Sequence, residues 1–202
     1  PTRVIYNGVR DLSHDPQEAL PGLQGQAFLL HISRLAPSKN VELLLQLAAL
    51  WPQRQFVLAG GDSPYARTVQ DSLISRQLHN VRLFLDVSDA QKAWLYAHCN
   101  AFLFPSMAEG FGLPPIEAMH FGKPVFLSRL TSLPEIGGAV ATYWDDLAPA
   151  AMRAVLETSD LTPVPARQAL IAAHARQFNW PSCVGAYLSC YRQWLKLPES
   201  AV

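Results

Sequence analysis

The stretch Ser106-Met-Ala-Glu-Gly-Phe-Gly-Leu-Pro-Pro-Ile-Glu-Ala-Met119 is the most informative part of this sequence. It places Glu109 and Glu117 on either side of a turn that contains two glycines and leads into a predicted helix. Two glycines let the backbone come close to a ligand, and a helix start offers free N–H groups and a positive dipole end to an anion. A carboxylate in the first helical turn, where we expect Glu117, can accept hydrogen bonds from two sugar hydroxyls. The stretch therefore indicates a site for a nucleotide-sugar.

Short apolar strands and helical patterns alternate on both sides of this stretch. Strands are expected at residues 27–32, 55–59, 81–85, 101–104 and 124–127. Helices are expected at residues 41–51, 65–78, 88–98 and 114–121, and Ser88 with Gln91 forms a capping box for the third of them. Continuous apolar strands favour a parallel sheet with helices on both faces. The sequence predicts an α/β fold, a Rossmann-like parallel sheet flanked by helices, with a mostly helical C-terminal segment over residues 147–197.

The composition fits one domain over residues 1–202 and argues against several classes of protein. The chain carries 16 basic and 16 acidic residues, whereas a nucleic-acid-binding domain normally has a basic excess. No apolar run is long enough to span a bilayer. The three cysteines lack the spacing of metal or redox motifs, and the six scattered histidines are predicted to be structural. We expect a cytoplasmic protein that does not bind nucleic acid.

Polar residues follow several of the predicted strands. Arg34 and Lys39 follow the first, Gly60 the second, Asp86 the third, and Glu109 the fourth. Ligands of open α/β sheets bind beyond the carboxyl ends of the strands, so these residues should share one edge. Arginine can pair with two phosphate oxygens and lysine supplies a point charge. Since no cluster of carboxylates suggests a metal cage, we predict that these two cations hold a diphosphate.

Simpler explanations exist for each of these residues. The helix dipole favours Glu117 in a first turn without any ligand, and Glu109 could be an exposed loop carboxylate. Gly60 could end a strand and Asp86 could occupy an ordinary turn, although both remain candidates for donor binding. The two cations could lie in a solvated loop. The sequence lacks the glycine motif of nicotinamide-dinucleotide sites and the phosphate loop of nucleotide triphosphatases.

The order of motifs resembles a known family. The chain resembles the C-terminal, donor-binding domain of the GT-B glycosyltransferases of family 4, the "glycosyl transferases group 1" type. The motifs that carry the resemblance are Tyr6-Asn-Gly-Val9, Ile32-Ser-Arg-Leu35 with Lys39-Asn40, Leu58-Ala-Gly-Gly61, Pro105-Ser106, Glu109 with Glu117, Ser132-Leu-Pro-Glu135 and Phe178-Asn-Trp180.

The resemblance implies a role for each site residue. Arg34 and Lys39 would hold the donor diphosphate, and with Glu109, which would contact the transferred sugar, they form the predicted catalytic set. Glu117 would bind the ribose. The loop that approaches the phosphates and the sugar would comprise Gly110, Phe111, Gly112 and Leu113. Such enzymes transfer a sugar with retention of configuration and without a catalytic metal, so no cofactor is expected besides the UDP- or GDP-sugar substrate.

The resemblance also implies partners. Relatives carry an N-terminal acceptor domain, which this sequence lacks, and we expect the 202 residues alone to bind donor weakly and transfer nothing. The acceptor would be a glycan or a lipid-linked acceptor molecule in bacterial surface polysaccharide synthesis. GDP-mannose would be the preferred donor, and the full-length protein would be peripheral to the inner membrane. Two alternatives remain: a free-standing sugar-nucleotide-binding module without catalysis, and an epimerase of the same fold.

The last predicted helix carries an apolar stripe at helical spacing. Its members are Val184, Tyr187, Leu188, Tyr191, Trp194 and Leu195. If the helix crosses toward the missing half, the stripe is exposed here and can mediate contacts in a homo-oligomer. The alternative is that it packs on the core of its own domain.

Overall fold

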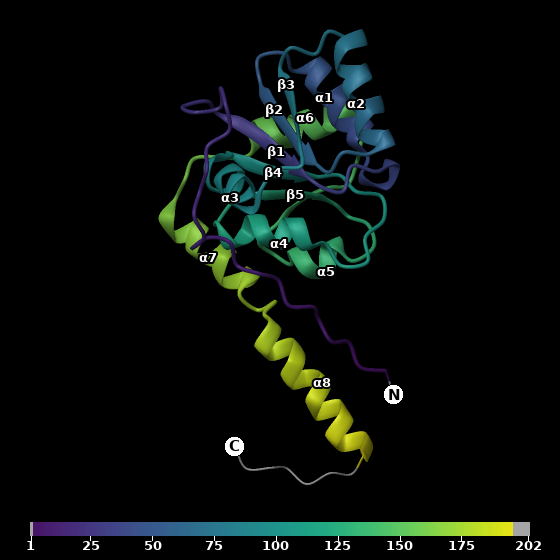
Figure 1. The fold of residues 1–202 in the computed structure, drawn as a ribbon, viewed down its shortest axis with the longest axis vertical. Helices are drawn as coiled ribbons and strands as arrows, with labels where there is room; N and C mark the ends of the chain where they lie inside the picture. The colour runs from purple at the N-terminus through teal and green to yellow at the C-terminus, as the bar shows by residue number, and fades with distance from the viewer. Residues whose placement is uncertain (1, 196–202) are drawn as a thin grey trace.

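The computed structural model describes residues 2–195, and within that range six strands form one parallel sheet (Figure 1). The strands are β1 (Phe28–Ile32), β2 (Gln55–Gly60), β3 (Val81–Leu85), β4 (Ala101–Phe104), β5 (Val125–Ser128) and β6 (Thr142–Trp144). Their spatial order is β3-β2-β1-β4-β5-β6. The predicted Rossmann-like sheet is confirmed, and β6 is a strand that the sequence did not indicate.

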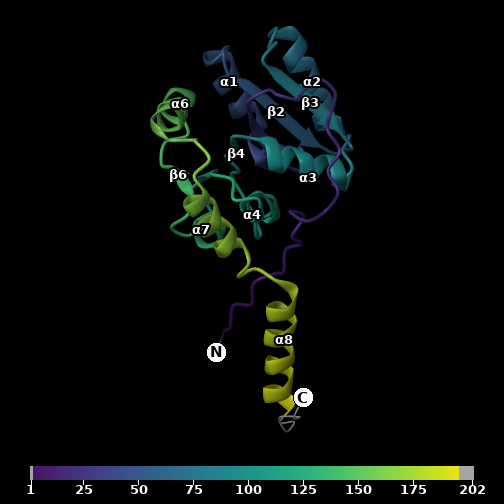
Figure 2. The same ribbon diagram turned by 90° about the vertical axis from the view of Figure 1, so that its left-hand side faces the viewer.

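Helices cover both faces of this sheet (Figures 1 and 2). They are the 3-10 helix η1 (Pro37–Lys39), α1 (Val41–Leu50), α2 (Pro64–Ser75), α3 (Asp89–His98), α4 (Leu113–His120), α5 (Leu133–Gly137), α6 (Pro149–Thr158), α7 (Pro165–Ala175) and α8 (Trp180–Leu195). One buried core contains residues of α1, α2 and α6, and the other contains residues of α3, α4, α5 and α7. The strands are apolar because they face both cores.

Local chemistry sets the starts of α3 and α4. The Ser88 hydroxyl accepts a hydrogen bond from the Gln91 N–H, and the Gln91 amide oxygen accepts one from the Ser88 N–H, each at 3.1 Å. The predicted capping box is therefore confirmed. Helix α4 follows Gly112, whose φ of 110° is rarely accessible to other residues. It starts at Leu113, one residue earlier than expected.

The chain order reverses between β1 and β4. From β1 the chain builds outward through β2 and β3, and it then returns to the opposite side of β1 as β4. In open α/β sheets this switch point leaves a crevice beyond the carboxyl ends of the two strands. The segments that follow β1 and β4 are therefore the ones that can form a site together.

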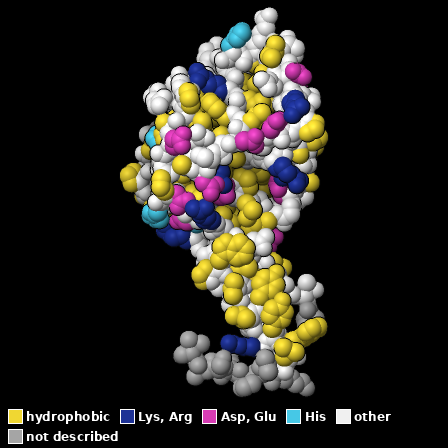
Figure 3. Space-filling view, viewed as in Figure 1, with side chains coloured by type: hydrophobic (Ala, Val, Ile, Leu, Met, Phe, Trp, Pro, Cys, Tyr) yellow, Lys and Arg dark blue, Asp and Glu magenta, His cyan; other side chains and the backbone are white. Residues whose placement is uncertain are grey.

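Helix α8 projects away from the sheet, beside the N-terminal segment (Figures 1 and 2). Among its residues 180–195 only Cys183 is buried, and the exposed side chains include Tyr187 at 45% and Trp194 at 88%. Hydrophobic side chains gather along it (Figure 3). The alternative that the stripe packs on the core of its own domain is wrong, because its side chains are exposed. Its contacts with a missing half or in a homo-oligomer remain predictions. Residues 196 and 197 of the predicted helix lie outside the described residues.

The helices of the described chain do not include a membrane span. Over residues 2–195, none combines the length and the apolar character that crossing a bilayer requires.

Candidate functional site

A cavity of about 350 Å³ lies at the switch point, beyond the ends of β1 and β4. Its lining consists of Asn7, Ser33, Arg34, Lys39, Phe104, Glu109, Phe111, Gly112, Leu113 and Pro114. Both predicted cations, Glu109 and most of the glycine-rich loop are thus brought together. The prediction that these segments share one edge of the sheet is confirmed in geometry, while the ligand contacts assigned to them remain predictions.

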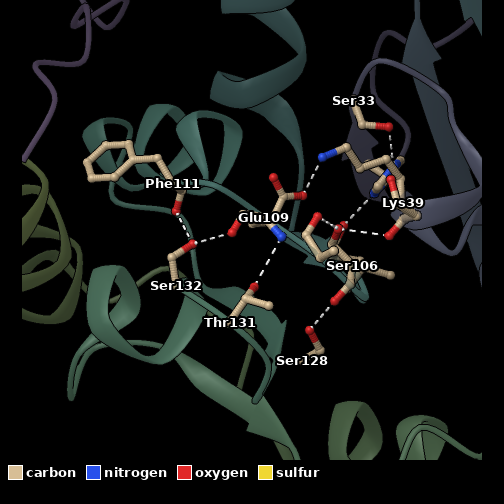
Figure 4. Close-up of polar contacts among 12 residues, drawn as sticks. Ser33, Lys39, Ser106, Glu109, Phe111, Ser128, Thr131 and Ser132 are labelled. Atoms are coloured by element: carbon tan, nitrogen blue, oxygen red, sulfur yellow. Dashed lines mark hydrogen bonds and ion pairs between the residues drawn. The ribbon is translucent and has the colours of Figure 1, made fainter.

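Lys39 and Glu109 form an ion pair within this cavity (Figure 4). The Lys39 Nζ lies 2.5 Å from the Glu109 Oε1, and the two side chains are only 13% and 8% exposed. The ammonium also lies 5.7 Å from the centre of the Phe104 ring. Arg34 has no hydrogen-bond or ion-pair partner among residues 2–195, so it is the cation that an incoming anion meets without competition.

Buried serines fasten the loop after β4 to its neighbours. The Ser38 carbonyl, in η1, accepts hydrogen bonds from the Ser106 hydroxyl at 3.0 Å and from the Met107 N–H at 2.8 Å. The Ser128 hydroxyl, at the end of β5, donates to the Ser106 carbonyl at 2.5 Å. The turns after β1, β4 and β5 are therefore joined by direct bonds (Figure 4).

Two residues before α5 hold the glycine-rich loop from its other side. The Thr131 hydroxyl oxygen accepts a hydrogen bond from the Glu109 N–H at 3.1 Å, and the Ser132 hydroxyl donates to the Phe111 carbonyl at 2.8 Å. Thr131 has a φ of 52°, which is strained for a β-branched residue. Its support of Glu109 could not be recognised from the sequence, because Thr131 belongs to none of the motifs.

An aromatic cluster covers the outer side of the same loop. The Phe111 ring centre lies 5.8 Å from that of Phe178 and 6.3 Å from that of Tyr6. The Tyr6 hydroxyl donates to the Glu135 Oε1 at 2.7 Å, and this bond is the main reason that the pKa of Tyr6 is raised. The first and last motifs of the resemblance therefore meet at the loop.

Glu117 lies elsewhere, and its predicted position was wrong. It is the fifth residue of α4 rather than part of the first turn, and it does not line the cavity. Its Oε2 accepts a hydrogen bond from the Tyr96 hydroxyl at 2.7 Å, and its Oε1 lies 3.4 Å from the Lys92 Nζ. Both partners belong to α3, so Glu117 joins α4 to α3. Burial, followed by the charge of Glu117, raises the pKa of Tyr96 well above its usual value.

Three further candidates lie near the cavity without lining it. A Cβ on Gly60 would lie 2.4 Å from the Ser33 carbonyl oxygen, so glycine is needed there for β2 to approach the end of β1. Asp86 occupies a turn with a φ of 51°, and its Oδ1 accepts a hydrogen bond from the Asp62 N–H at 3.0 Å. A Cβ on Gly110 would meet open space. Packing accounts for the first two, and their donor contacts remain predictions.

A buried histidine stands behind the cavity. The His31 ring packs against the rings of Phe102 and Phe104 at 6.4 and 5.5 Å between centres. Burial, with a smaller contribution from the charge of Lys39, lowers the pKa of His31 to about 4. The imidazole is therefore neutral near pH 7.

The described residues offer no evident metal centre. Within residues 2–195 there is no group of three or more histidine, cysteine, aspartate or glutamate side chains that could hold a metal ion.

The parallel sheet, with a cavity at its switch point, has the fold of one half of a GT-B protein, and comparison with known proteins identifies the family. Residues 17–141 match the family model described as "Glycosyl transferases group 1". This match covers more than half of the sequence, so the chain belongs to that family. The resemblance found in the sequence is confirmed.

Curated relatives are considerably longer than this chain. O-antigen chain mannosyltransferase B of Escherichia coli is 32% identical over 196 residues, which cover 90% of this chain and 51% of the relative. D-inositol 3-phosphate glycosyltransferase of Mycolicibacterium smegmatis is 30% identical over 207 residues, covering 93% of this chain and 46% of the relative. The chain spans about half the length of these proteins.

Solved structures support the same fold. The sucrose-phosphate synthase of Thermosynechococcus elongatus matches with a TM-score of 0.74 at 23% identity, covering 97% of this chain and 53% of that one. The Anabaena protein HepE, solved in complex with UDP and glucose, matches with a TM-score of 0.73 at 22% identity, covering 96% of this chain and 57% of that one. Both similarities concern the fold.

The ion pair leads to a stability prediction. Lys39→Met or Glu109→Gln alone should lower the free energy of unfolding by about 3–5 kcal/mol, because each leaves a nearly buried charge without its partner. The double variant should lose much less stability than the sum of the two single losses, since no unpaired charge remains. Urea unfolding of all four proteins measures this coupling. The exposed pair of Arg129 and Asp145 is the matched control, with a coupling of about 1 kcal/mol or less. Additive losses at Lys39 and Glu109 would contradict the pairing.

The neutral histidine leads to a prediction of pH dependence. Between pH 6.5 and about 4 the unfolded chain binds a proton at His31 that the folded chain does not, so the free energy of unfolding falls as the pH falls through this window. The expected loss from this group is about 3 kcal/mol. His31→Gln should therefore show a shallower fall between pH 7 and pH 4 in equilibrium unfolding, since every other titrating group is common to both proteins. Parallel curves would refute the assignment.

Proposed function

We propose that this chain is the donor half of a retaining glycosyltransferase that takes its sugar from a nucleoside diphosphate sugar. The observation that carries the proposal is the cavity at the switch point, where the unpaired cation Arg34, the Lys39–Glu109 pair and the start of α4 meet. The family and the mannosyltransferase relatives make GDP-mannose the first donor to test.

The start of α4 would act on the diphosphate mainly through its dipole. A helix leaves its first four N–H groups unpaired, but Pro114 and Pro115 have none to offer. These four positions start at the N-cap Gly112, so only Gly112 and Leu113 keep such donors there. The negative charge would therefore depend strongly on Arg34, and on the loop backbone from Gly110 to Gly112.

Donor binding would exchange partners in the ion pair. A diphosphate next to Arg34 would also attract the Lys39 ammonium, which would release the Glu109 carboxylate to accept hydrogen bonds from the transferred sugar. As the bond to the sugar breaks, charge grows on the departing diphosphate, and Arg34, Lys39 and the α4 dipole would stabilise it. We assign no covalent nucleophile and no metal to this step.

Glu117 remains the proposed acceptor for the ribose hydroxyls. Tyr96 and Lys92 hold its carboxylate in one orientation, and each oxygen keeps a lone pair for a further hydrogen bond. The ribose would then lie toward the α3 side of α4, with the diphosphate between it and the transferred sugar.

The whole protein would need a second half for its acceptor. We propose that this acceptor is a glycan or lipid-linked sugar in bacterial surface polysaccharide synthesis, as the names of the O-antigen relatives suggest, with the enzyme in the cytoplasm at the inner membrane. A sugar-nucleotide-binding module without catalysis is the alternative. An epimerase would need its own acid-base groups in the cavity, and Glu109 supplies the single carboxylate among the lining residues.

Calorimetry with UDP, GDP and ADP, and with their sugar conjugates, tests the binding proposal. Arg34→Ala should weaken nucleoside diphosphate binding by about tenfold to a hundredfold, because one charge-assisted bond is lost, and should leave nucleoside binding unchanged. Arg129→Ala is the control, since Arg129 lies at the same sheet edge but is paired with Asp145. Equal losses for nucleoside and diphosphate, or no binding by the unaltered chain, would contradict the proposal.

A transfer assay tests the need for a second half. The 202 residues should bind the sugar conjugate and release no sugar to an acceptor glycan, as judged by mass spectrometry of the acceptor. Turnover by this chain alone would show that the acceptor half is dispensable.

A further inference from the structure

The orientation of the Ser33 side chain is not explained by the proposed diphosphate site. It follows β1 directly, lines the cavity, and is only 7% exposed. Its Oγ lies 2.8 Å from the Nε2 of His31, two residues earlier in the chain. Its backbone N–H donates to the Ala59 carbonyl of β2 at 3.1 Å, which holds the backbone in place.

The second nitrogen of His31 determines the direction of this bond. The His31 Nδ1 lies 2.8 Å from the Leu103 carbonyl oxygen on the neighbouring strand. A carbonyl can only accept, so Nδ1 carries the proton and donates. In a neutral imidazole the other nitrogen is then an acceptor. The Ser33 hydroxyl must therefore donate its single proton to Nε2.

The Ser33 oxygen consequently faces the cavity only as an acceptor. Its proton is donated to His31, and no group of residues 2–195 donates a hydrogen bond to its oxygen. The lone pairs of this oxygen are therefore available to a ligand. Lys39, which also lines the cavity, donates to Glu109. A phosphate oxygen, which is also an acceptor, would be repelled at this position, whereas a hydroxyl group would be bound.

We propose that Ser33 accepts a hydrogen bond from a hydroxyl group of the transferred sugar, and that His31 is the positioning residue that sets the polarity of this bond. This inference rests on the proposed function. Ser33 would then favour sugars that carry that hydroxyl over sugars that lack it, because leaving a buried acceptor without a donor costs binding free energy. The diphosphate would lie toward Arg34, on the other side of the sugar.

The first test needs no ligand. Nitrogen NMR of the histidine-labelled chain should show His31 in the Nδ1-protonated form at neutral pH, and that signal should be absent from the His31→Phe variant. A His31 protonated at Nε2 would overturn the inference, because the serine proton would then be free to point into the cavity.

The second test measures affinity by calorimetry with the nucleoside diphosphate and its sugar conjugate. Ser33→Ala should weaken the conjugate by about threefold to tenfold and leave the diphosphate unchanged. Ser33→Cys keeps a proton for His31 but offers a poor acceptor, so it should weaken binding of the conjugate as much as Ser33→Ala does. The cysteine variant keeps the test valid if the alanine variant is unstable. Ser75→Ala, on the exposed surface of α2, should change neither affinity.

Deoxy and deoxyfluoro sugar conjugates identify the hydroxyl and the direction of the bond. Fluorine cannot donate a hydrogen bond. At one ring position, the deoxy and the deoxyfluoro conjugate should therefore bind the unaltered chain equally weakly. The Ser33→Ala variant should bind both analogues as tightly as it binds the parent conjugate. Retained affinity for the fluoro analogue would make Ser33 a donor and overturn the inference. Equal weakening of diphosphate and conjugate by Ser33→Ala would place Ser33 at the phosphates, leaving the proposed function intact. Absence of any nucleotide binding would overturn both.

Discussion

The nearly buried ion pair of Lys39 and Glu109 is the interaction on which the geometry of the cavity depends. It joins the turn after β1 to the loop after β4, at the point where the strand order reverses. Removing two charges from water is costly, and only close contact with good surrounding bonds offsets that cost. Hydrogen bonds to the Ser38 carbonyl and to the Thr131 hydroxyl hold the two backbone segments that bring the charges into contact. A ligand that binds one of the two charged side chains must therefore also offer a hydrogen-bonding or charged partner to the other.

The sheet and the longer helices could be predicted because burial and capping leave local patterns in the sequence. β4 is apolar at all four positions because both of its faces are covered. Ser88 marks the start of α3 because it forms the capping box with Gln91. β6 has three residues and α5 has five, which is too short for a period to appear. For α4, a start one residue earlier than expected was enough to move Glu117 out of the first turn.

The candidate site was predictable only as far as strand direction determines it. Parallel strands bring their carboxyl ends to one edge, so Arg34, Lys39 and Glu109 could be grouped from the sequence. The pairing of Lys39 with Glu109, across 70 positions, depends on the packing of side chains in the folded chain. The same holds for the polarity of Ser33, which is set by a carbonyl on the adjacent strand.

Phe111 connects the glycine-rich loop to both ends of the sequence, because Tyr6 and Phe178 pack against its ring. The Val9 N–H also donates to the Phe178 carbonyl at 2.8 Å, so the two terminal segments support each other as well. The choice of boundaries for a shortened protein is therefore constrained. A shortened protein could omit α8 and its exposed aromatic side chains. The glycine-rich loop should then stay ordered only if the chain is cut after Phe178 and its first ten residues are kept.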